Sequence, residues 1–151
     1  AHLFEVPTAL LSLVDSDRQW FKARTGCDLT ETSRDTAFCA HAVAARELLV
    51  VPDATSDPRF AENPLVVGPP GIRFYAGAPL VTDDGHALGT LCLIDVVPRQ
   101  LEARDLHTLN ALAATAMALI EARRALLRER ALTTRLSMEL GDRQRGAPMQ
   151  A

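Results

Sequence analysis

Three cysteines are the side chains of this chain best suited to nucleophilic chemistry. Redox chemistry needs a reactive thiolate and a second thiol within disulfide reach, about 6 Å between Cα atoms. Cys39 lies in a short apolar segment, and Cys92 lies in the middle of an apolar run. No tight cysteine cluster is visible, so the sequence predicts free, buried and inert thiols of a reducing compartment.

The four histidines do not form a metal-binding pattern. His41 follows Cys39 by two positions, and side chains at that spacing on a helix point apart. His2, His86 and His107 are scattered along the chain. The sequence also contains no GxxxxGK[ST] phosphate loop and no evident Ser-His-Asp arrangement. We therefore predict no metal site, no cofactor and no enzymatic activity of this chain.

A proline-rich segment over residues 53–71 places charged, amide and aromatic side chains close together. It holds four of the nine prolines, and so long and stiff a loop inside a compact domain is usually functional. With the residues that follow, it suits a small polar or planar ligand. The candidate ligand-binding residues are Asp53, Asp57, Arg59, Phe60, Asn63, Arg73 and Tyr75. The alternative is structural: Asp57 can cap a turn and Arg59 can pair with a nearby carboxylate.

The element that must position these residues is a predicted β-hairpin over residues 72–97. Apolar runs over 74–81 and 87–97 flank the turn 82–86, whose Asp-Gly pair favours a tight reversal. Apolar residues at both parities predict strands that are covered on both faces. The other predicted elements are strands over 6–14, 19–24 and 48–52, a loop over 25–35, and a helix over 35–44 capped by Ser33 or Asp35.

A helix of about 40 residues, roughly 60 Å long, is predicted from Glu102 onward. One heptad track, which Thr133 interrupts, contains Leu112, Leu119, Leu126 and Leu140. A globular domain of this size has a radius of gyration of only about 13 Å, so the helix must extend beyond its own domain. We expect its second half to bury this stripe against a second copy, giving a parallel homodimer. The alternatives are a second half that folds back or frays.

Composition narrows the class of protein. At 151 residues and 48% hydrophobic, the chain has the size and composition of one domain that buries a sizeable core. A net charge of −3 gives no bulk attraction to nucleic acid or to an anionic membrane. The longest apolar run is too short to cross a membrane, and the N-terminus does not resemble a signal peptide. We expect a cytoplasmic domain that is a piece of a longer protein.

Several segments, in order, resemble the GAF domain family. They are FCAHA at 38–42, LVVPDA at 49–54, DPRF at 57–60, GIRFYAGAPL at 71–80 and GHALGTLCLID at 85–95. The resemblance covers residues 6–120 and is to the bacterial branch found upstream of histidine kinases and cyclic-dinucleotide enzymes. It implies an α+β fold with a central antiparallel β-sheet flanked by helices. A cavity would lie between the sheet and the crossover loops, and a long C-terminal helix would follow.

This resemblance implies a small-molecule-sensing regulatory domain of a bacterial signal-transduction protein. We expect a GAF sensory domain over residues 1–120, a signalling or coiled-coil helix over 121–145 and a tail over 146–151. The dimerising helix would relay ligand state to an output domain of the parent protein, such as a two-component histidine kinase. Two alternatives stay open: a free methionine-sulfoxide reductase of the same fold, and a ligand-free dimerisation module.

Overall fold

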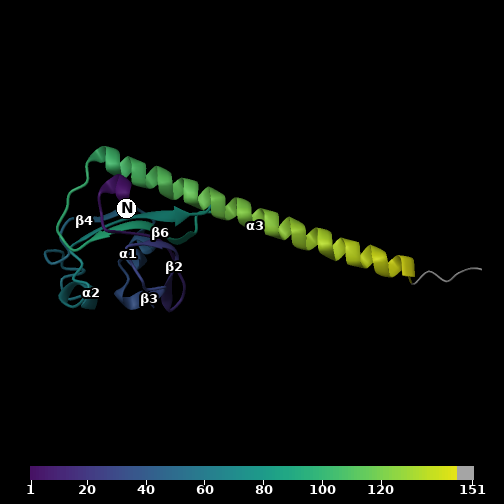
Figure 1. Ribbon diagram of the computed structural model, residues 1–151, viewed down its shortest axis with the longest axis horizontal. Coiled ribbons are helices and arrows are strands. Elements are labelled where there is room, and N and C mark those ends of the chain that lie inside the picture. The colour runs from purple at the N-terminus through teal and green to yellow at the C-terminus, as the bar shows by residue number, and fades with distance from the viewer. Residues whose placement is uncertain (146–151) are drawn as a thin grey trace, which may run out of the picture. The chain divides into compact units, whose positions relative to one another are not determined.

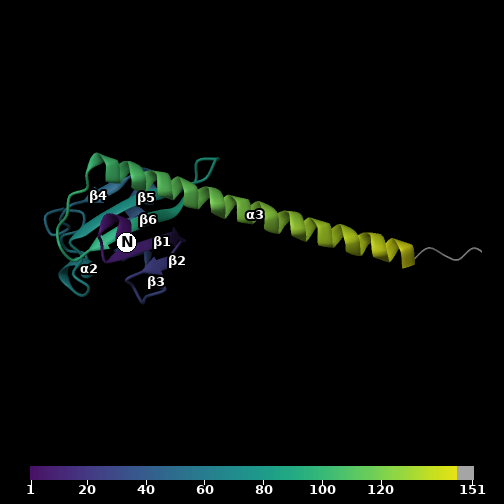
Figure 2. The same ribbon diagram turned by 45° about the horizontal axis from the view of Figure 1, so that its top comes forward.

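The structure, a computed structural model, describes residues 1–145, with side chains described to residue 139. Its centre is an antiparallel sheet with strand order β3-β2-β1-β6-β5-β4 (Figures 1 and 2). The strands are β1 Thr8–Val14, β2 Arg18–Thr25, β3 Glu31–Ser33, β4 Leu49–Val51, β5 Phe74–Val81 and β6 Ala87–Asp95. The predicted α+β class with a central antiparallel sheet is confirmed. The predicted tail over 146–151 lies outside the described residues.

The central hairpin forms where the sequence predicts it. β5 and β6 pair from Phe74 opposite Asp95 to Val81 opposite Ala87. At the turn, Gly85 has a φ of 83°, a conformation that glycine adopts without strain, and its N–H donates to the Thr82 carbonyl at 2.8 Å. Every residue from Phe74 to Ala78 is buried, so β5 is covered on both faces, as predicted.

The remaining helices are short, except the last. They are the 3-10 turns η1 His2–Phe4 and η2 Arg34–Thr36, and the α-helices α1 Phe38–Ala45, α2 Pro64–Val67 and α3 Ala103–Arg145. Ser33 caps η2 by accepting from the Asp35 N–H, whereas α1 begins without a side-chain cap. The predicted loop over 25–35 is wrong in part, because residues Glu31–Ser33 form β3 and pair with β2.

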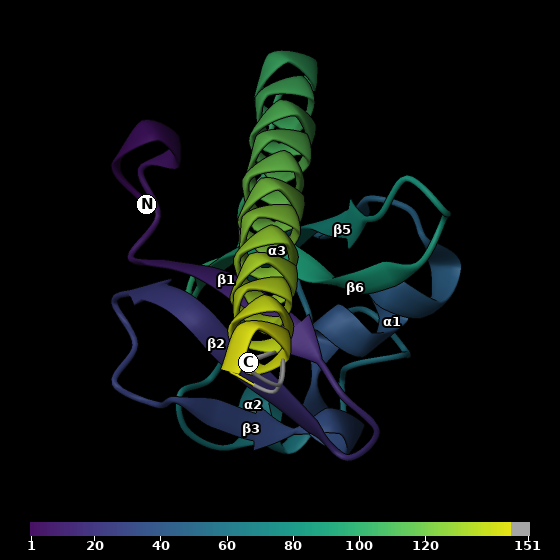
Figure 3. The ribbon, with the colours of Figure 1, turned by 90° about the vertical axis from the view of Figure 1, so that its right-hand side faces the viewer.

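The strands place alternate side chains on opposite faces of the sheet. Leu10 lies opposite Cys92 in the β1–β6 ladder, and both belong to the apolar cluster that includes Phe38 of α1. α1 packs against β5 and β6 on this face (Figure 3). The intervening residues of β5, such as Phe74 and Ala76, are completely buried toward the other face. The sheet therefore separates an α1 face from a second apolar face.

The first turns of α3 cover that second face within a compact unit over residues 1–117 (Figure 1). Leu109, Ala113 and Met117 are all buried, and their spacing of four residues places them on one stripe of the helix. From Ala118 the helix continues as a second unit. There Leu119 and Leu126 are 68% and 47% exposed. The predicted long helix is thus confirmed, with 43 residues.

Candidate functional site

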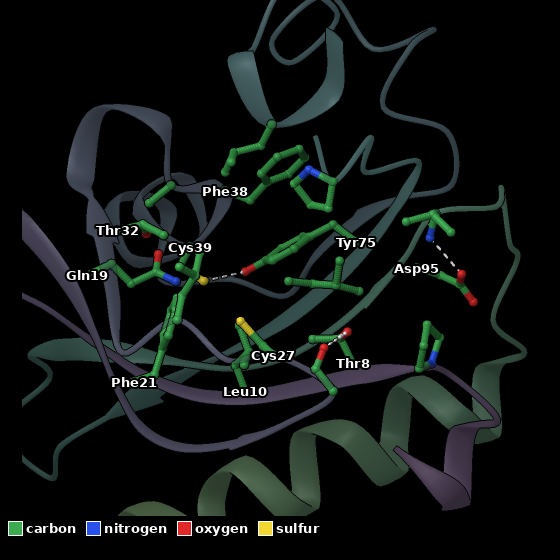
Figure 4. A pocket seen from close by; sticks show the side chains of 18 of the residues that line it. Thr8, Leu10, Gln19, Phe21, Cys27, Thr32, Phe38, Cys39, Tyr75 and Asp95 are labelled. Atoms are coloured by element: carbon green, nitrogen blue, oxygen red, sulfur yellow. Dashed lines mark hydrogen bonds between the residues drawn. The ribbon is translucent and has the colours of Figure 1, made fainter. Parts of the chain in front are cut away.

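A cavity of about 440 Å³ opens on the α1 face of the sheet (Figure 4). Its walls come from β1, β2, α1, the start of β5 and the loop that carries Pro69 and Pro70. The wall includes Cys39, which is 1% exposed, and Leu29, which is 56% exposed, so the cavity runs from the surface to the core. Its volume lies within the range of small-molecule sites, about 300–1,000 Å³.

The lining is mainly apolar, with a few polar groups. Leu10, Phe21 and Phe38 supply apolar surface, and Thr8, Gln19, Thr32 and Asp95 supply oxygen atoms. No Lys, Arg or His occurs among the described residues that line the cavity. The carboxylate of Asp95 is already paired, since Arg99 Nε donates to it at 2.5 Å. The cavity therefore suits an uncharged, largely apolar molecule.

Gln19 is the polar residue whose state points most directly to a ligand. It lies in β2 at the same parity as the buried Phe21, and it is 4% exposed. Within the described part of the chain, its buried Oε1 has no hydrogen-bond partner. Leaving a buried acceptor unsatisfied costs about 1–3 kcal/mol. A molecule in the cavity that donates a hydrogen bond to Oε1 would remove this cost.

A cluster of thiol and hydroxyl groups adjoins the inner end of the cavity, where Cys39 and Tyr75 line the wall. The Sγ atoms of Cys39 and Cys92 are 3.8 Å apart. The Tyr75 hydroxyl donates to Cys39 Sγ at 3.2 Å (Figure 4), and the Ser12 hydroxyl donates to it at 3.4 Å. Ser12 Oγ is also 3.0 Å from Thr90 Oγ1. Four elements, α1, β1, β5 and β6, thus converge on one sulfur atom.

The hydrogen bonds shift the pKa values of the two thiols in opposite directions. Burial raises the pKa of the Cys39 thiol, but hydrogen bonds from Cys92, Ser12, Thr90 and Tyr75 outweigh burial and lower the pKa to about 6. The hydrogen bond to Cys39, together with burial, raises the pKa of Cys92 well above its ordinary value. The first proton therefore leaves Cys39, and Cys92 stays a thiol that donates to it.

Tyr75 reaches Cys39 because residue 77 has no side chain. A Cβ at Gly77 would collide with the Tyr75 ring and hydroxyl, so only glycine leaves room for the ring to lie across β5. Burial raises the pKa of the Tyr75 hydroxyl, and negative charge on Cys39 or Cys92 raises it further, so it remains a donor. Of the residues predicted to bind a ligand, Tyr75 is the one that lines the cavity.

The charged candidates lie elsewhere. Asp53, Asp57 and Arg59 line a shallow surface depression beside Pro52. Arg59 donates to both carboxylate oxygens of Asp57, at 2.9 and 2.6 Å, and this hydrogen bonding lowers the pKa of Asp57. The Thr55 hydroxyl and N–H donate to Asp53 at 2.7 and 3.0 Å and lower its pKa. These three side chains are held by their near neighbours.

Phe60, Asn63 and Arg73 have structural contacts. The Phe60 ring is stacked on Phe38 with centroids 4.2 Å apart. Asn63 accepts from the Leu65 N–H at 2.9 Å and so caps α2. Arg73 Nη1 donates to three backbone carbonyls, those of Val66, Gly71 and Ile72, at 3.0–3.1 Å. A ligand-binding role for the predicted set stays a prediction.

The model of the GAF domain family matches residues 1–120. The chain belongs to the GAF domain family. It is 49% identical over 123 residues to a cyclic di-GMP phosphodiesterase of Pseudomonas aeruginosa, a match that covers 81% of this chain and 21% of that protein. The GAF chain thus spans about a fifth of the length of this curated relative.

Solved structures share the fold. The GAF domain of an Acinetobacter phosphoenolpyruvate-protein phosphotransferase is 16% identical, with a TM-score of 0.67 over 85% of this chain and 78% of that chain. The free methionine-R-sulfoxide reductase of Neisseria meningitidis, solved with its substrate, is 23% identical, with a TM-score of 0.67 over 83% of this chain and 73% of that chain. At these identities the likeness concerns the fold alone.

Two features of the GAF site were not predicted from the sequence. Cys39 and Cys92 are buried free thiols, as predicted, but their sulfur atoms are also in contact, which the sequence does not show. They are 53 residues apart and meet only because α1 packs on β6. Gln19 was also missed, and its signal was a polar residue at the core-facing parity of β2.

No group of three or more His, Cys, Asp or Glu side chains among the described residues is arranged to hold a metal ion. None of the helices described has the length and apolar run that a membrane span needs.

Proposed function

We propose that this GAF domain binds a small uncharged molecule in the cavity and that α3 relays the bound state to an output domain of the parent protein. The observation that carries the proposal is the unpartnered, buried Gln19 Oε1 in the wall of an apolar cavity of about 440 Å³. Unsatisfied buried acceptors are rare in native proteins, and one in a cavity wall marks a place where a ligand donor fits.

The lining also indicates which ligands are unsuitable. Phosphate groups are usually bound by Arg, Lys or backbone N–H groups at a helix N-terminus, and no cationic side chain is present among the described lining residues. A cyclic dinucleotide, which carries two phosphates, is therefore a poor occupant. We infer that any cyclic-dinucleotide chemistry belongs to a neighbouring domain of the parent protein and that this GAF domain regulates it. The similarity to one segment of a phosphodiesterase supports that inference.

The relay would pass through the sheet. Leu10 and Tyr75 contact the cavity, while the adjacent residues of β5, Phe74 and Ala76, are buried toward the face that α3 covers. A small displacement of β5 by a ligand therefore moves the surface on which the first turns of α3 pack. Transmission requires the ligand to bind two arrangements of this contact with different affinity.

Hydrogen exchange tests the sensing function. The probe is 2-naphthol, an uncharged planar molecule with one hydroxyl donor, added to the 151-residue chain. We expect saturating 2-naphthol to slow amide exchange in β1, β2 and β5 and to change exchange between residues 103 and 117, the part of α3 seated on the sheet. Buffer with the same co-solvent and no 2-naphthol is the control. Protection of the strands with unaltered exchange in α3 would contradict the relay.

The contact between Cys39 and Cys92 favours a second candidate function, reduction of free methionine sulfoxide. The fold shared with the Neisseria meningitidis reductase is compatible with it. In this reaction the Cys39 thiolate would attack the sulfoxide, the sulfoxide S–O bond would break with uptake of one proton from water, and methionine would leave with Cys39 as a sulfenic acid. The Cys92 thiol would then attack the Cys39 sulfur, forming the disulfide and releasing the oxygen as water. Turnover of free methionine-R-sulfoxide with dithiothreitol as reductant, abolished in Cys39→Ser and in Cys92→Ser, would establish this function. Absence of turnover in the unaltered chain favours the sensor.

A further inference from the structure

The sulfur atoms of Cys39 and Cys92 are close enough for a covalent bond after a small movement. They are 3.8 Å apart, and a disulfide bond measures about 2.05 Å, so the atoms must approach by less than 2 Å. Cys39 belongs to α1 and Cys92 to β6, two elements that pack directly on each other. We propose that hydroperoxides oxidise this pair to a Cys39–Cys92 disulfide, which makes the inner end of the cavity a redox-sensitive site.

Cys39 is the thiol that attacks. It is the second residue of α1, where the positive end of the helix dipole favours a thiolate. The hydroxyls of Ser12 and Tyr75 donate to its sulfur at 3.4 and 3.2 Å. Burial raises the pKa of Cys39, but the hydrogen bonds from Cys92, Ser12, Thr90 and Tyr75 outweigh burial and lower the pKa to about 6. Cys92 keeps its proton until the second step, because its pKa is raised.

Access from solvent also favours Cys39 over Cys92 as the thiol that meets the hydroperoxide. Cys39 lines the cavity that reaches the surface near the exposed Leu29, whereas Cys92 is not among the lining residues. A molecule as small as hydrogen peroxide can therefore approach Cys39 through the cavity. Cys92 is 0% exposed and does not line the cavity, so we expect it to react with the oxidised sulfur of Cys39 and not with the hydroperoxide.

The oxidation proceeds in two steps. In the first, the Cys39 thiolate attacks one oxygen of the hydroperoxide, the O–O bond breaks, and the alkoxide or hydroxide takes a proton from water, leaving Cys39 as a sulfenic acid. In the second, the Cys92 thiol loses its proton and attacks the Cys39 sulfur, the S–O bond breaks, and water leaves. In sum, the two thiols lose two electrons and the hydroperoxide gains them. An organic hydroperoxide yields one alcohol and one water molecule, and hydrogen peroxide yields two water molecules. An external dithiol reverses the change by thiol–disulfide exchange.

Oxidation would alter the wall of the cavity. In the reduced protein, Cys39 Sγ accepts hydrogen bonds from Ser12 and Tyr75. A disulfide sulfur is a much weaker acceptor than a thiolate, so both hydroxyls lose their charged partner. This redox site does not depend on the ligand proposed above, because the oxidation is tested in protein without added ligand.

The test begins with the reduced 151-residue chain and a small excess of hydrogen peroxide. Thiols titrated in denaturant are expected to fall from three to one per chain, and a non-reducing peptide map is expected to contain a Cys39–Cys92 disulfide that dithiothreitol removes. Retention of all the thiols, or a disulfide that includes Cys27, would overturn the proposal. This readout needs no variant, so it stands even if a substitution impairs folding.

Variants separate the roles of the thiols. Cys92→Ser should stop the reaction at a Cys39 sulfenic acid that dimedone labels, and Cys39→Ser should leave nothing to label. Cys27→Ser is the control and should still form the Cys39–Cys92 disulfide, because the hydrogen bonds described for Cys39 and Cys92 do not include Cys27. If dimedone labels Cys92 in Cys39→Ser as fast as it labels Cys39 in Cys92→Ser, the assignment of Cys39 as nucleophile is contradicted.

The pH dependence gives an independent readout. Because only the thiolate reacts, the oxidation rate should fall about tenfold per pH unit below the pKa of about 6 and level off about one pH unit above it. Removing a donor with Tyr75→Phe should raise this pKa and move the profile to higher pH. A wild-type profile that still rises between pH 8 and 9, as for an ordinary thiol with a pKa of about 8.5, would overturn the proposal.

Discussion

Replacing Phe60 by alanine is expected to lower the free energy of unfolding by about 3–5 kcal/mol. The Phe60 side chain is 1% exposed. Its ring stacks on Phe38 with centroids 4.2 Å apart and makes a T-shaped contact with the His41 ring with centroids 4.8 Å apart. Truncation would leave a void between α1 and the 53–71 segment that these neighbours cannot fill. Urea denaturation followed by circular dichroism measures the change.

Val67→Ala provides the matched control for this substitution. Val67 lies in α2 and is 72% exposed, so its truncation is expected to change stability by less than about 0.5 kcal/mol. A Phe60→Ala variant that keeps its stability but loses affinity for 2-naphthol would contradict the structural role and return Phe60 to the ligand-binding set.

The second large effect concerns the proposed dimer. Leu126→Asp is expected to weaken self-association on the order of 100-fold or more, because each copy loses a leucine worth about 1.5–3 kcal/mol when buried and gains a charge at the helix interface. Leu126 is 47% exposed in the single chain, and Leu119 lies one heptad before it and is 68% exposed. Sedimentation equilibrium of the two proteins gives the dissociation constants.

Ala131→Asp is the charge-matched control, since it adds the same charge to α3 away from the leucine track. We expect it to leave the dissociation constant within a few-fold of wild type. Equal effects of the two substitutions would show that charge, and not the leucine stripe, governs association. A wild-type chain that sediments as a monomer at high micromolar concentration would contradict the dimer itself.

Local signals account for what the sequence predicts well. The central hairpin follows from Asp84-Gly85 between two apolar runs, and α3 follows from its leucine spacing and the scarcity of glycine after residue 102. Strand β3 was missed because Glu31–Ser33 contains no apolar alternation. Its position is set by pairing with β2, which no local pattern reports.

The site was harder to predict, because it depends on packing between distant segments. The charges of Asp57 and Arg59 suggested a ligand, but they neutralise each other two residues apart. The cavity instead takes its walls from β1, β2 and α1, where one buried glutamine was the available signal. The contact between Cys39 and Cys92 likewise depends on how α1 docks on the sheet.

The most direct test of the account is the coupling between Gln19 and the donor of a ligand. Fluorescence titration would compare 2-naphthol with naphthalene, which lacks the hydroxyl, for the wild type, Gln19→Met and the exposed control Gln100→Met. The account predicts that the wild type and Gln100→Met bind 2-naphthol about tenfold more tightly than naphthalene, the equivalent of one hydrogen bond of about 1.4 kcal/mol, and that Gln19→Met loses this preference. Failure of 2-naphthol to bind the wild type, or a preference that persists in Gln19→Met, would contradict it.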